Sequence, residues 1–269
     1  MINKIVRKIR ELFFFEQFHQ IYWKGLYPDW QAAMHRARGY DDEAILERVK
    51  KAIIEVKEGR AVFERDGEVF YHTEYNYPLA TFLLKVAIEN NGKLRVLDFG
   101  GSLGSTWLQH RALLEKLDVK WHIVEQPHFV AAGREIFKNH PVLSFYNQIE
   151  EIPEKKDLFI VASGVLQCIN NYQNILQRLI ALHANYFYID RLPLTSKSTH
   201  LLTLQFVRRN DGVEESYPSW VFSKELFLRK LNHAYRLVSE GKSLDIVAAK
   251  VKGLPGYFDN FCWLYFEKR

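Results

Sequence analysis

Residues 94–107, which read LRVLDFGGSLGSTW, constrain the fold of this 269-residue chain more than any other segment. An apolar run leads to Asp98, glycines follow at Gly100, Gly101 and Gly104, and a pattern with helical periodicity comes next. This order is typical of a buried strand, a tight turn and a helix start. Glycine permits close approach to the main chain, and the N–H groups at a helix start face whatever binds there. The segment therefore predicts a ligand-binding strand–turn–helix unit.

Strand and helix patterns alternate after this turn. Apolar runs predict strands at residues 120–125, 143–146, 157–162 and 185–190. Helical patterns lie at residues 105–117, 129–139 and 172–183. Continuous apolar strands separated by helices indicate an α/β fold with a doubly wound, mostly parallel sheet covered on both faces. Residues 235–239 and 258–267 predict a terminal antiparallel hairpin on that sheet.

The chain before the glycine turn predicts an N-terminal helical extension over residues 1–92, and residues 93–269 the main domain. Residues 1–24 have a basic amphipathic pattern that predicts a helix, which would lie on an anionic membrane surface, pack on the domain or fray. A hairpin is expected around Asp66-Gly67. The polar-aromatic loop at residues 72–77 and an insertion at about 196–222 would cap the site.

The composition limits the partners and the compartment. The net charge is +5, yet no dense Lys/Arg stripe with interleaved aromatic residues predicts a nucleic-acid partner. Cys168 and Cys262 are far apart in sequence and lie in apolar surroundings, which predicts buried free thiols in a reducing compartment. The protein is therefore expected in the cytoplasm, with peripheral contact to the inner membrane if residues 1–24 bind it. No His, Cys, Asp or Glu grouping has metal-ligand spacing, and the sequence leaves the oligomeric state open.

The charges around the turn indicate the class of ligand. Asp98 would repel a phosphate but suits ammonium, sulfonium or hydroxyl groups, which favours S-adenosylmethionine over a nucleotide polyphosphate. Glu125 ends the next strand about 20 residues later, where a carboxylate can accept hydrogen bonds from ribose hydroxyls. A nicotinamide-binding fold would share that second acid but would normally lack Asp98. The expected cofactor-binding residues are Asp98, Gly100, Gly101, Ser102, Leu103, Gly104, Glu125, Gln126, Asn147 and Ser163.

A family resemblance rests on several motifs spread over the chain. They are Trp30-Gln31-Ala32-Ala33, Gly39-Tyr40-Asp41, Glu64-Arg65-Asp66, LDFGGSLG (97–104), VEQ (124–126), SGVLQ (163–167), IDRLP (189–193), Gln205 and SYPSWVFS (216–223). The chain resembles class I S-adenosylmethionine-dependent methyltransferases, and more narrowly a methyltransferase family associated with bacterial surface-polysaccharide loci. The resemblance implies a Rossmann-like seven-stranded sheet, S-adenosylmethionine as cofactor, and a small-molecule or carbohydrate-type acceptor.

Methyl transfer to a hydroxyl calls for a base or an electrostatic partner, because the hydroxyl pKa is high. The candidate catalytic residues are His72, Asp190, Arg191 and His200, each of which could instead have a structural role. Ser102 departs from the superfamily pattern, since it stands where the middle glycine of the turn falls. This departure motivates a second hypothesis, a non-catalytic binding or scaffold module. An NAD(P)-dependent oxidoreductase is disfavoured by Asp98 and by a missing Tyr-x-x-x-Lys.

Overall fold

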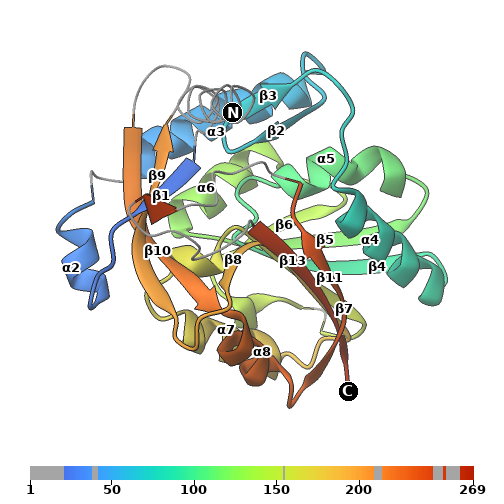
Figure 1. Cartoon of the computed structure of the whole chain (residues 1–269). Coiled ribbons are helices and arrows are strands. Elements are labelled where there is room, and N and C mark those ends of the chain that lie inside the picture. Colours follow the sequence, from blue (N-terminus) through green and yellow to red (C-terminus); the bar gives the residue numbers. More distant parts are fainter. Residues whose placement is uncertain (1–20, 38–41, 154, 209–213, 245–250, 253–260) are drawn as a thin grey trace, which may run out of the picture.

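The structure is a computed structural model that describes residues 21–37, 42–153, 155–208, 214–244, 251–252 and 261–269. A β-sheet with helices on both faces forms the centre of the molecule (Figure 1). The order of the central strands is β6-β5-β4-β7-β8-β13-β11. Their bounds are β4 Lys93–Phe99, β5 Asp118–Val124, β6 Leu143–Tyr146, β7 Leu158–Ser163, β8 Tyr186–Thr195, β11 Tyr235–Lys242 and β13 Phe261–Lys268.

The strand directions confirm the predicted fold class. β4 pairs in parallel with β5 on one side and β7 on the other, and β5–β6 and β7–β8 are parallel as well. β13 runs antiparallel to both β8 and β11, which gives the expected terminal antiparallel hairpin. The chain leaves β4 towards β5 and β6, then crosses back to β7. The carboxyl ends of β4 and β7 therefore flank the switch point, where open α/β sheets bind ligands.

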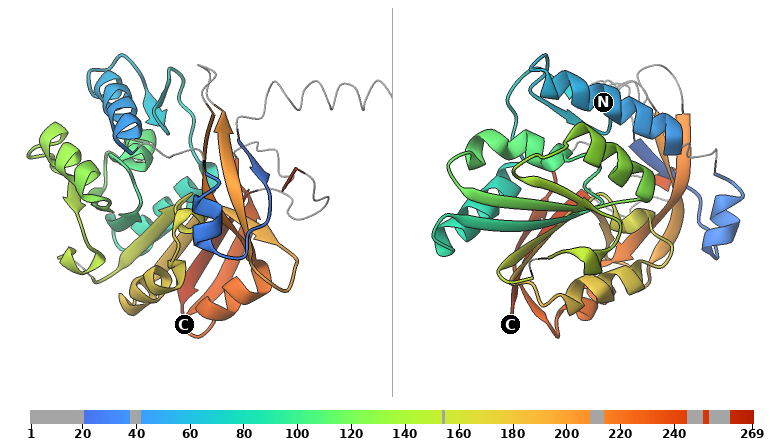
Figure 2. Two further views of the ribbon diagram at one scale, coloured as in Figure 1. Left: turned by 90° about the vertical axis from the view of Figure 1, so that its left-hand side faces the viewer. Right: turned by 180° about the vertical axis from the view of Figure 1, so that it is seen from behind.

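Alternation along the strands builds a core on each face of the sheet. Leu94 and Val96 of β4 face one core, whereas Leu97 and Phe99 face the other. The helices of the first core are α3 (Asp42–Lys57), α4 (Tyr77–Glu89), α5 (Ser105–Leu114) and α6 (Pro127–Ile136). Those of the second core are α7 (Tyr172–Ala181) and α8 (Lys224–Leu231). Figure 2 shows these layers from two further sides.

Four strands extend the sheet beyond the carboxyl end of β8, where β10 joins it in parallel. They are β10 (Glu214–Ser223), β9 (Leu201–Arg208), β1 (Ile21–Lys24) and β12 (Val251–Lys252). The short helix α2 (Trp30–Met34) packs on the outer face of β9. The helix expected over residues 1–24 is thus wrong for its last four residues, because residues 21–24 pair with β9 as a strand. Residues 1–20 lie outside the described part.

The hairpin expected around Asp66-Gly67 is confirmed. Its strands are β2 (Phe63–Arg65) and β3 (Glu68–Phe70), which pair antiparallel. Asp66 and Gly67 have φ of 54° and 83°, as a tight two-residue turn with positive φ at both central positions requires. β2 packs against α3 and α5, so the hairpin reaches the carboxyl end of β4.

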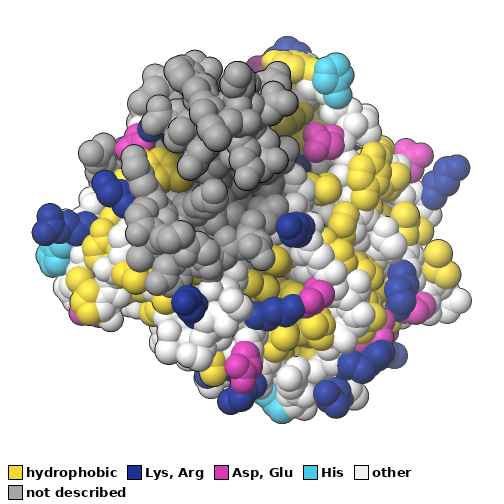
Figure 3. Space-filling model, viewed as in Figure 1, with side chains coloured by type: hydrophobic (Ala, Val, Ile, Leu, Met, Phe, Trp, Pro, Cys, Tyr) yellow, Lys and Arg dark blue, Asp and Glu magenta, His cyan; other side chains and the backbone are white. Residues whose placement is uncertain are grey.

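The described surface is mixed in character. Lys and Arg side chains lie among acidic and apolar ones on the face shown in Figure 3. Among the described helices, none is both long and apolar enough to cross a membrane. Cys168 and Cys262 are free thiols, and both are half-buried rather than fully buried.

Candidate functional site

The turn after β4 has the backbone shape that its glycines predict. Gly100 and Gly104 have φ of 71° and 94°, a region that side chains rarely adopt. Ser102, which replaces the middle glycine of the superfamily pattern, takes φ of 54°. The serine therefore keeps a left-handed conformation of the kind a glycine would favour there. α5 begins directly after this turn, and Gly104 is its N-cap.

Asp98 and the turn form one packed unit. The carboxyl group is buried, with 1% of the side chain exposed, and Trp121 Nε1 donates a hydrogen bond to Asp98 Oδ2 at 3.0 Å. A Cβ on Gly101 would lie 2.5 Å from Asp98 Cγ, so only glycine leaves room for this carboxylate. Burial raises the Asp98 pKa to about 6. A cation bound beside the turn would offset that cost, as desolvation penalises the charged form.

Glu125 links the end of β5 to the glycine turn. Its Oε1 accepts the Ser102 N–H at 3.2 Å, and its Oε2 accepts the Gln126 N–H at 2.7 Å. The carboxylate is thereby held beside the turn at half-buried depth. Exposed Asn147 follows β6, the next strand along the sheet edge. Two acids flanking a glycine turn at a switch point fit the ammonium, sulfonium and ribose hydroxyls of S-adenosylmethionine.

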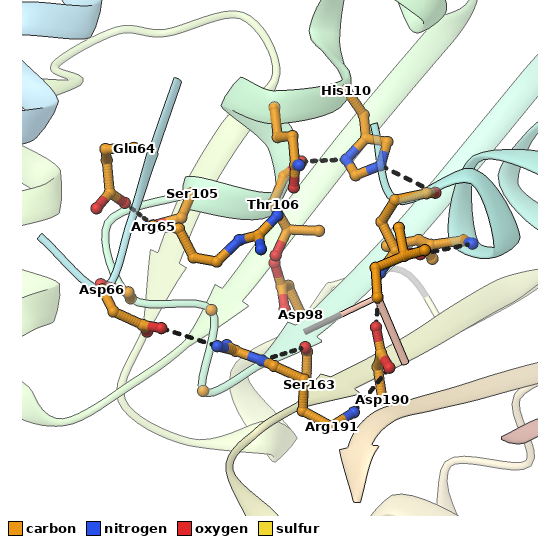
Figure 4. A pocket seen from close by; sticks show the side chains of 17 residues that line it. Glu64, Arg65, Asp66, Asp98, Ser105, Thr106, His110, Ser163, Asp190 and Arg191 are labelled. Carbon is orange, nitrogen blue, oxygen red and sulfur yellow. Dashed lines mark hydrogen bonds and ion pairs between the residues drawn. The ribbon is translucent and has the colours of Figure 1, made fainter. Parts of the chain in front are cut away.

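A pocket opens beside this turn, between the sheet edge, α4, α5 and the β2–β3 hairpin (Figure 4). Seven of the predicted site residues line it: Asp98, Gly100, Gly101, Ser102, Ser163, Asp190 and Arg191. Residues that the sequence argument did not propose also line it, among them Glu64, Arg65, Asp66, Asn76, Ser105, Thr106, Gln109 and His110. The pocket is therefore built from both sides of the predicted division at residue 92.

Asp190 ends the part of β8 that pairs with β7, and it accepts three hydrogen bonds. The donors are Asn76 Nδ2 at 2.6 Å, Ser243 Oγ at 2.5 Å and the Arg191 N–H at 2.7 Å. Burial is the main cause that raises the Asp190 pKa, although these donors oppose it. Asn76 Oδ1 also accepts the Leu79 N–H and so caps α4. Asp190 thus ties the α4 N-terminus to the sheet.

Arg191 spans the pocket from β8 to the hairpin, as Figure 4 shows. Its Nη1 donates to Asp66 Oδ2 at 2.8 Å and its Nε to Ser163 Oγ at 3.2 Å. A Cβ on Gly164 would lie 2.9 Å from Arg191 Nε, so the guanidinium lies directly over that glycine. Arg191 lowers the Asp66 pKa. The Asp66 side chain is 67% exposed, so we expect this pair to add little to stability.

Glu64 and His110 complete the inner wall of the pocket. The Glu64 side chain is 1% exposed, and its carboxylate accepts hydrogen bonds from Ser105 Oγ and from the Gly67 N–H at 3.0 Å. Burial raises the Glu64 pKa to about 7. His110 is fully buried, with Nδ1 at 2.8 Å from the Thr106 carbonyl oxygen, and burial lowers its pKa.

Other predicted residues lie outside the pocket lining. His72 is exposed, and Leu103 is packed in the core. His200 is half-buried, and its Nδ1 accepts the Ser223 N–H at 3.0 Å. Its ring lies 5.8 Å from the Tyr172 ring, and burial lowers its pKa. Among the described residues, no group of His, Cys, Asp and Glu could hold a metal ion.

The residues that sequence reasoning missed come from two places: Glu64, Arg65, Asp66 and Asn76 are distant in sequence from the glycine turn, whereas Ser105, Thr106, Gln109 and His110 lie on α5 directly after it. Glu64 is separated by 41 positions from Ser105, its hydrogen-bond partner. The motif Glu64-Arg65-Asp66, which carried part of the resemblance, was the available signal for this hairpin. Asn76 lies in the loop expected to cover the site. His110 falls on the face of α5 that packs towards the pocket, and helical periodicity assigns that face to the core.

Comparison with known proteins gives matches among solved structures only. An S-adenosylmethionine-dependent methyltransferase from Clostridium acetobutylicum is 14% identical, with a TM-score of 0.48, over 81% of this chain and 97% of that one. The 1,6-didemethyltoxoflavin-N1-methyltransferase of Burkholderia thailandensis is 15% identical, with a TM-score of 0.44, over 91% and 99%. An amino pentose methyltransferase from Micromonospora echinaspora is 8% identical, with a TM-score of 0.42, over 73% and 92%.

No protein-family profile matches the sequence. No curated protein matches it either. At 8–15% identity the structural similarities concern the fold alone, because one fold hosts many functions. The function has to be argued from the site.

Proposed function

We propose that this chain is an S-adenosylmethionine-dependent methyltransferase that acts on a small-molecule or carbohydrate-type acceptor. The observation that carries the proposal is the unit made by Asp98, the glycine turn and Glu125 at the switch point. There, Ser102 donates its N–H to Glu125, and the Gly101 backbone lies against the Asp98 carboxylate. Asp98, Gly100, Gly101, Ser102 and Glu125 would hold the cofactor, which supplies an electrophilic methyl group. Gly104, Gln126, Asn147 and Ser163 would complete its site.

The acceptor would enter from the side of the pocket that residues 1–92 build. This side is polar, as expected for an acceptor rich in hydroxyl or amine groups. The narrower resemblance extends the proposal to surface-polysaccharide synthesis in the cytoplasm. The contact to the inner membrane would then fall to residues 1–20, because residues 21–24 are paired in the sheet as β1. In this arrangement Asp190 positions the α4 cap, and Arg191 joins the hairpin to the sheet.

Calorimetric titration with S-adenosylmethionine and S-adenosylhomocysteine tests the proposal. We expect micromolar binding of both by the wild-type protein and none by Gly100→Arg, because a Cβ at Gly100 would lie 2.5 Å from Val165 Cγ2. Gly59→Arg is the matched control. Gly59 also has positive φ, at 75°, but a Cβ there meets nothing within 4 Å. A folded wild-type sample that binds neither ligand would contradict the proposal.

The scaffold hypothesis makes a different prediction for the same protein. Ser102 motivates the scaffold hypothesis, yet its backbone has positive φ, as do the backbones of Gly100 and Gly104 in the same turn. A scaffold that retains the cofactor would bind it without turnover on any acceptor. Screening amino and neutral sugars for methylation by a cofactor-binding sample separates the two hypotheses.

A further inference from the structure

The pocket contains one carboxyl group for which the cofactor site provides no role. Among the described residues, four carboxylates line the pocket: Glu64, Asp66, Asp98 and Asp190. Asp66 pairs with Arg191, and Asp190 is held by three donors. Asp98 lies against the glycine turn and accepts the Trp121 N–H. Glu64 is the remaining one, and it belongs to the hairpin rather than to the sheet.

Glu64 is buried with only neutral donors. Ser105 Oγ donates to its Oε1 and the Gly67 N–H to its Oε2. An ionised carboxylate has about four lone-pair positions, so these two donors leave acceptor capacity. Charged groups are rarely buried without a paired charge, since desolvation is costly. A carboxyl group that is buried without a paired charge at the wall of a pocket is a candidate for a functional residue.

The surroundings of Glu64 set its electrostatics. Asp66 of the hairpin and Arg191 of β8 are the charged groups that act on Glu64. Further charged and titratable groups near the hairpin are Arg65, Asp98 and His110, which line the same pocket, and Arg48 of α3, which lies beside Gly67. Burial has the largest effect on the Glu64 pKa, Asp66 acts in the same direction, and Arg191 opposes them. The resulting pKa of about 7 suits proton transfer near neutral pH.

We propose that Glu64 is the catalytic base that accepts the proton of the acceptor's hydroxyl or amine during methyl transfer. The proposal rests on the methyltransferase function and deepens it. Glu64 Oε takes the proton as the new oxygen–methyl or nitrogen–methyl bond forms. The methyl–sulfur bond of the sulfonium donor breaks, and its electron pair stays on sulfur. Glu64 then returns the proton to solvent. The acceptor class is a neutral hydroxyl or an amine, because the acidic lining disfavours an anionic acceptor.

A binding measurement tests this role without a known acceptor. A base that reaches the acceptor atom lies within about 6 to 7 Å of the sulfonium, where charges interact appreciably at an effective dielectric of about 20. The positively charged S-adenosylmethionine should then gain affinity over the neutral S-adenosylhomocysteine as Glu64 ionises. Between about pH 5.5 and about pH 8 we expect the wild-type preference to rise at least about tenfold.

Variants assign that rise to Glu64. In Glu64→Gln the rise should be at least about tenfold smaller, leaving only the share from Asp98. Glu64→Asp keeps the negative charge, so its preference for S-adenosylmethionine should still rise with pH. This variant replaces Glu64→Gln in the experiment if Glu64→Gln does not fold. Glu68→Gln removes an exposed carboxylate from the same hairpin and should match the wild type.

The outcomes separate the two levels of the proposal. A wild-type protein that binds neither ligand overturns the methyltransferase function and the role of Glu64 together. A wild-type protein that binds both ligands, with the same pH response in Glu64→Gln, overturns the role of Glu64 alone. Reduction of the pH response in Glu64→Gln to the share from Asp98, with the full response in Glu68→Gln, supports the base.

Discussion

Glu64→Gln should gain stability relative to the wild type as pH rises, because the buried carboxylate is costly in its charged form. Burial raises the Glu64 pKa from 4.5 to about 7 in the folded state. The folded protein therefore binds more protons than the unfolded chain between these values, and the free energy of unfolding falls as pH rises through this window. The free energy of unfolding of the wild type falls in total by about 3 kcal/mol, at about 1.4 kcal/mol per pKa unit. Glu64→Gln has no such pH-dependent fall, because glutamine does not ionise.

Urea unfolding followed by tryptophan fluorescence gives the measurement. The quantity to compare is the unfolding free energy of Glu64→Gln minus that of the wild type. We expect this difference to increase by about 3 kcal/mol between about pH 4.5 and about pH 8. The amide of Glu64→Gln weakens the hydrogen bonds to Ser105 and Gly67, and this changes the free-energy difference by the same amount at every pH. Asp98 titrates in both proteins, so its contribution cancels in the difference.

A control and a clear contrary result accompany this experiment. Glu68→Gln changes an exposed carboxylate on the same hairpin, so its difference from the wild type should stay constant with pH. If the Glu64→Gln difference is equally constant, the Glu64 carboxyl is not desolvated in solution. The argument that makes Glu64 a base near neutral pH would then fail.

Three further substitutions test the rest of the site. Gly101→Ala would place a Cβ 2.5 Å from Asp98 Cγ, and calorimetry should show at least about a tenfold loss of S-adenosylmethionine affinity. Wild-type affinity for this cation should increase as pH rises through about 6, where Asp98 ionises, and Asp98→Asn should remove that part of the pH dependence. Asp190→Asn replaces one acceptor oxygen with an NH2 donor, which then faces either the Asn76 Nδ2 donor or the Ser243 Oγ donor, and urea unfolding should show a loss of about 2 kcal/mol.

The sheet could be predicted from sequence because buried parallel strands need continuous apolar runs. β6 begins and ends at the predicted residues, 143–146, and β7 is shifted by one. Helix ends were less accurate. The pattern at 105–117 continues the apolar period of α5, but the helix ends at Leu114. Capping decides such ends, and periodicity carries little information about it.

β1 shows what a local pattern misses. Residues 21–24 follow a segment with helical periodicity, and a strand of four residues has too few positions to establish a period of two. Its partner β9 lies far along the chain, with Ile21 opposite Val207. β8 likewise extends beyond Asp190 to Thr195, because β13 pairs with Leu192 and Pro193 and β10 pairs with Leu194 and Thr195.

The residues of the candidate site also differ in whether a local sequence pattern could place them. Asp98, Ser163 and Asp190 could be placed together from sequence, since the carboxyl ends of parallel strands meet at one edge of the sheet. Glu64 could not, because a glutamate in a short hairpin has the pattern of an ordinary polar residue. His200 is a candidate from sequence because histidine titrates near neutral pH, whereas in the structure its Nδ1 accepts the Ser223 N–H.

The two sides of the pocket are held together by the residues between them. Arg191 reaches from the sheet to Asp66 of the hairpin, and Asp190 reaches Asn76 at the start of α4. Both links leave from adjacent residues of β8, next to the switch point. The hairpin and the start of α4 thereby contact the same strand, beside the cofactor turn. A base on the hairpin is consequently positioned by the same strand that borders the cofactor site, which in-line methyl transfer demands of its two reactants.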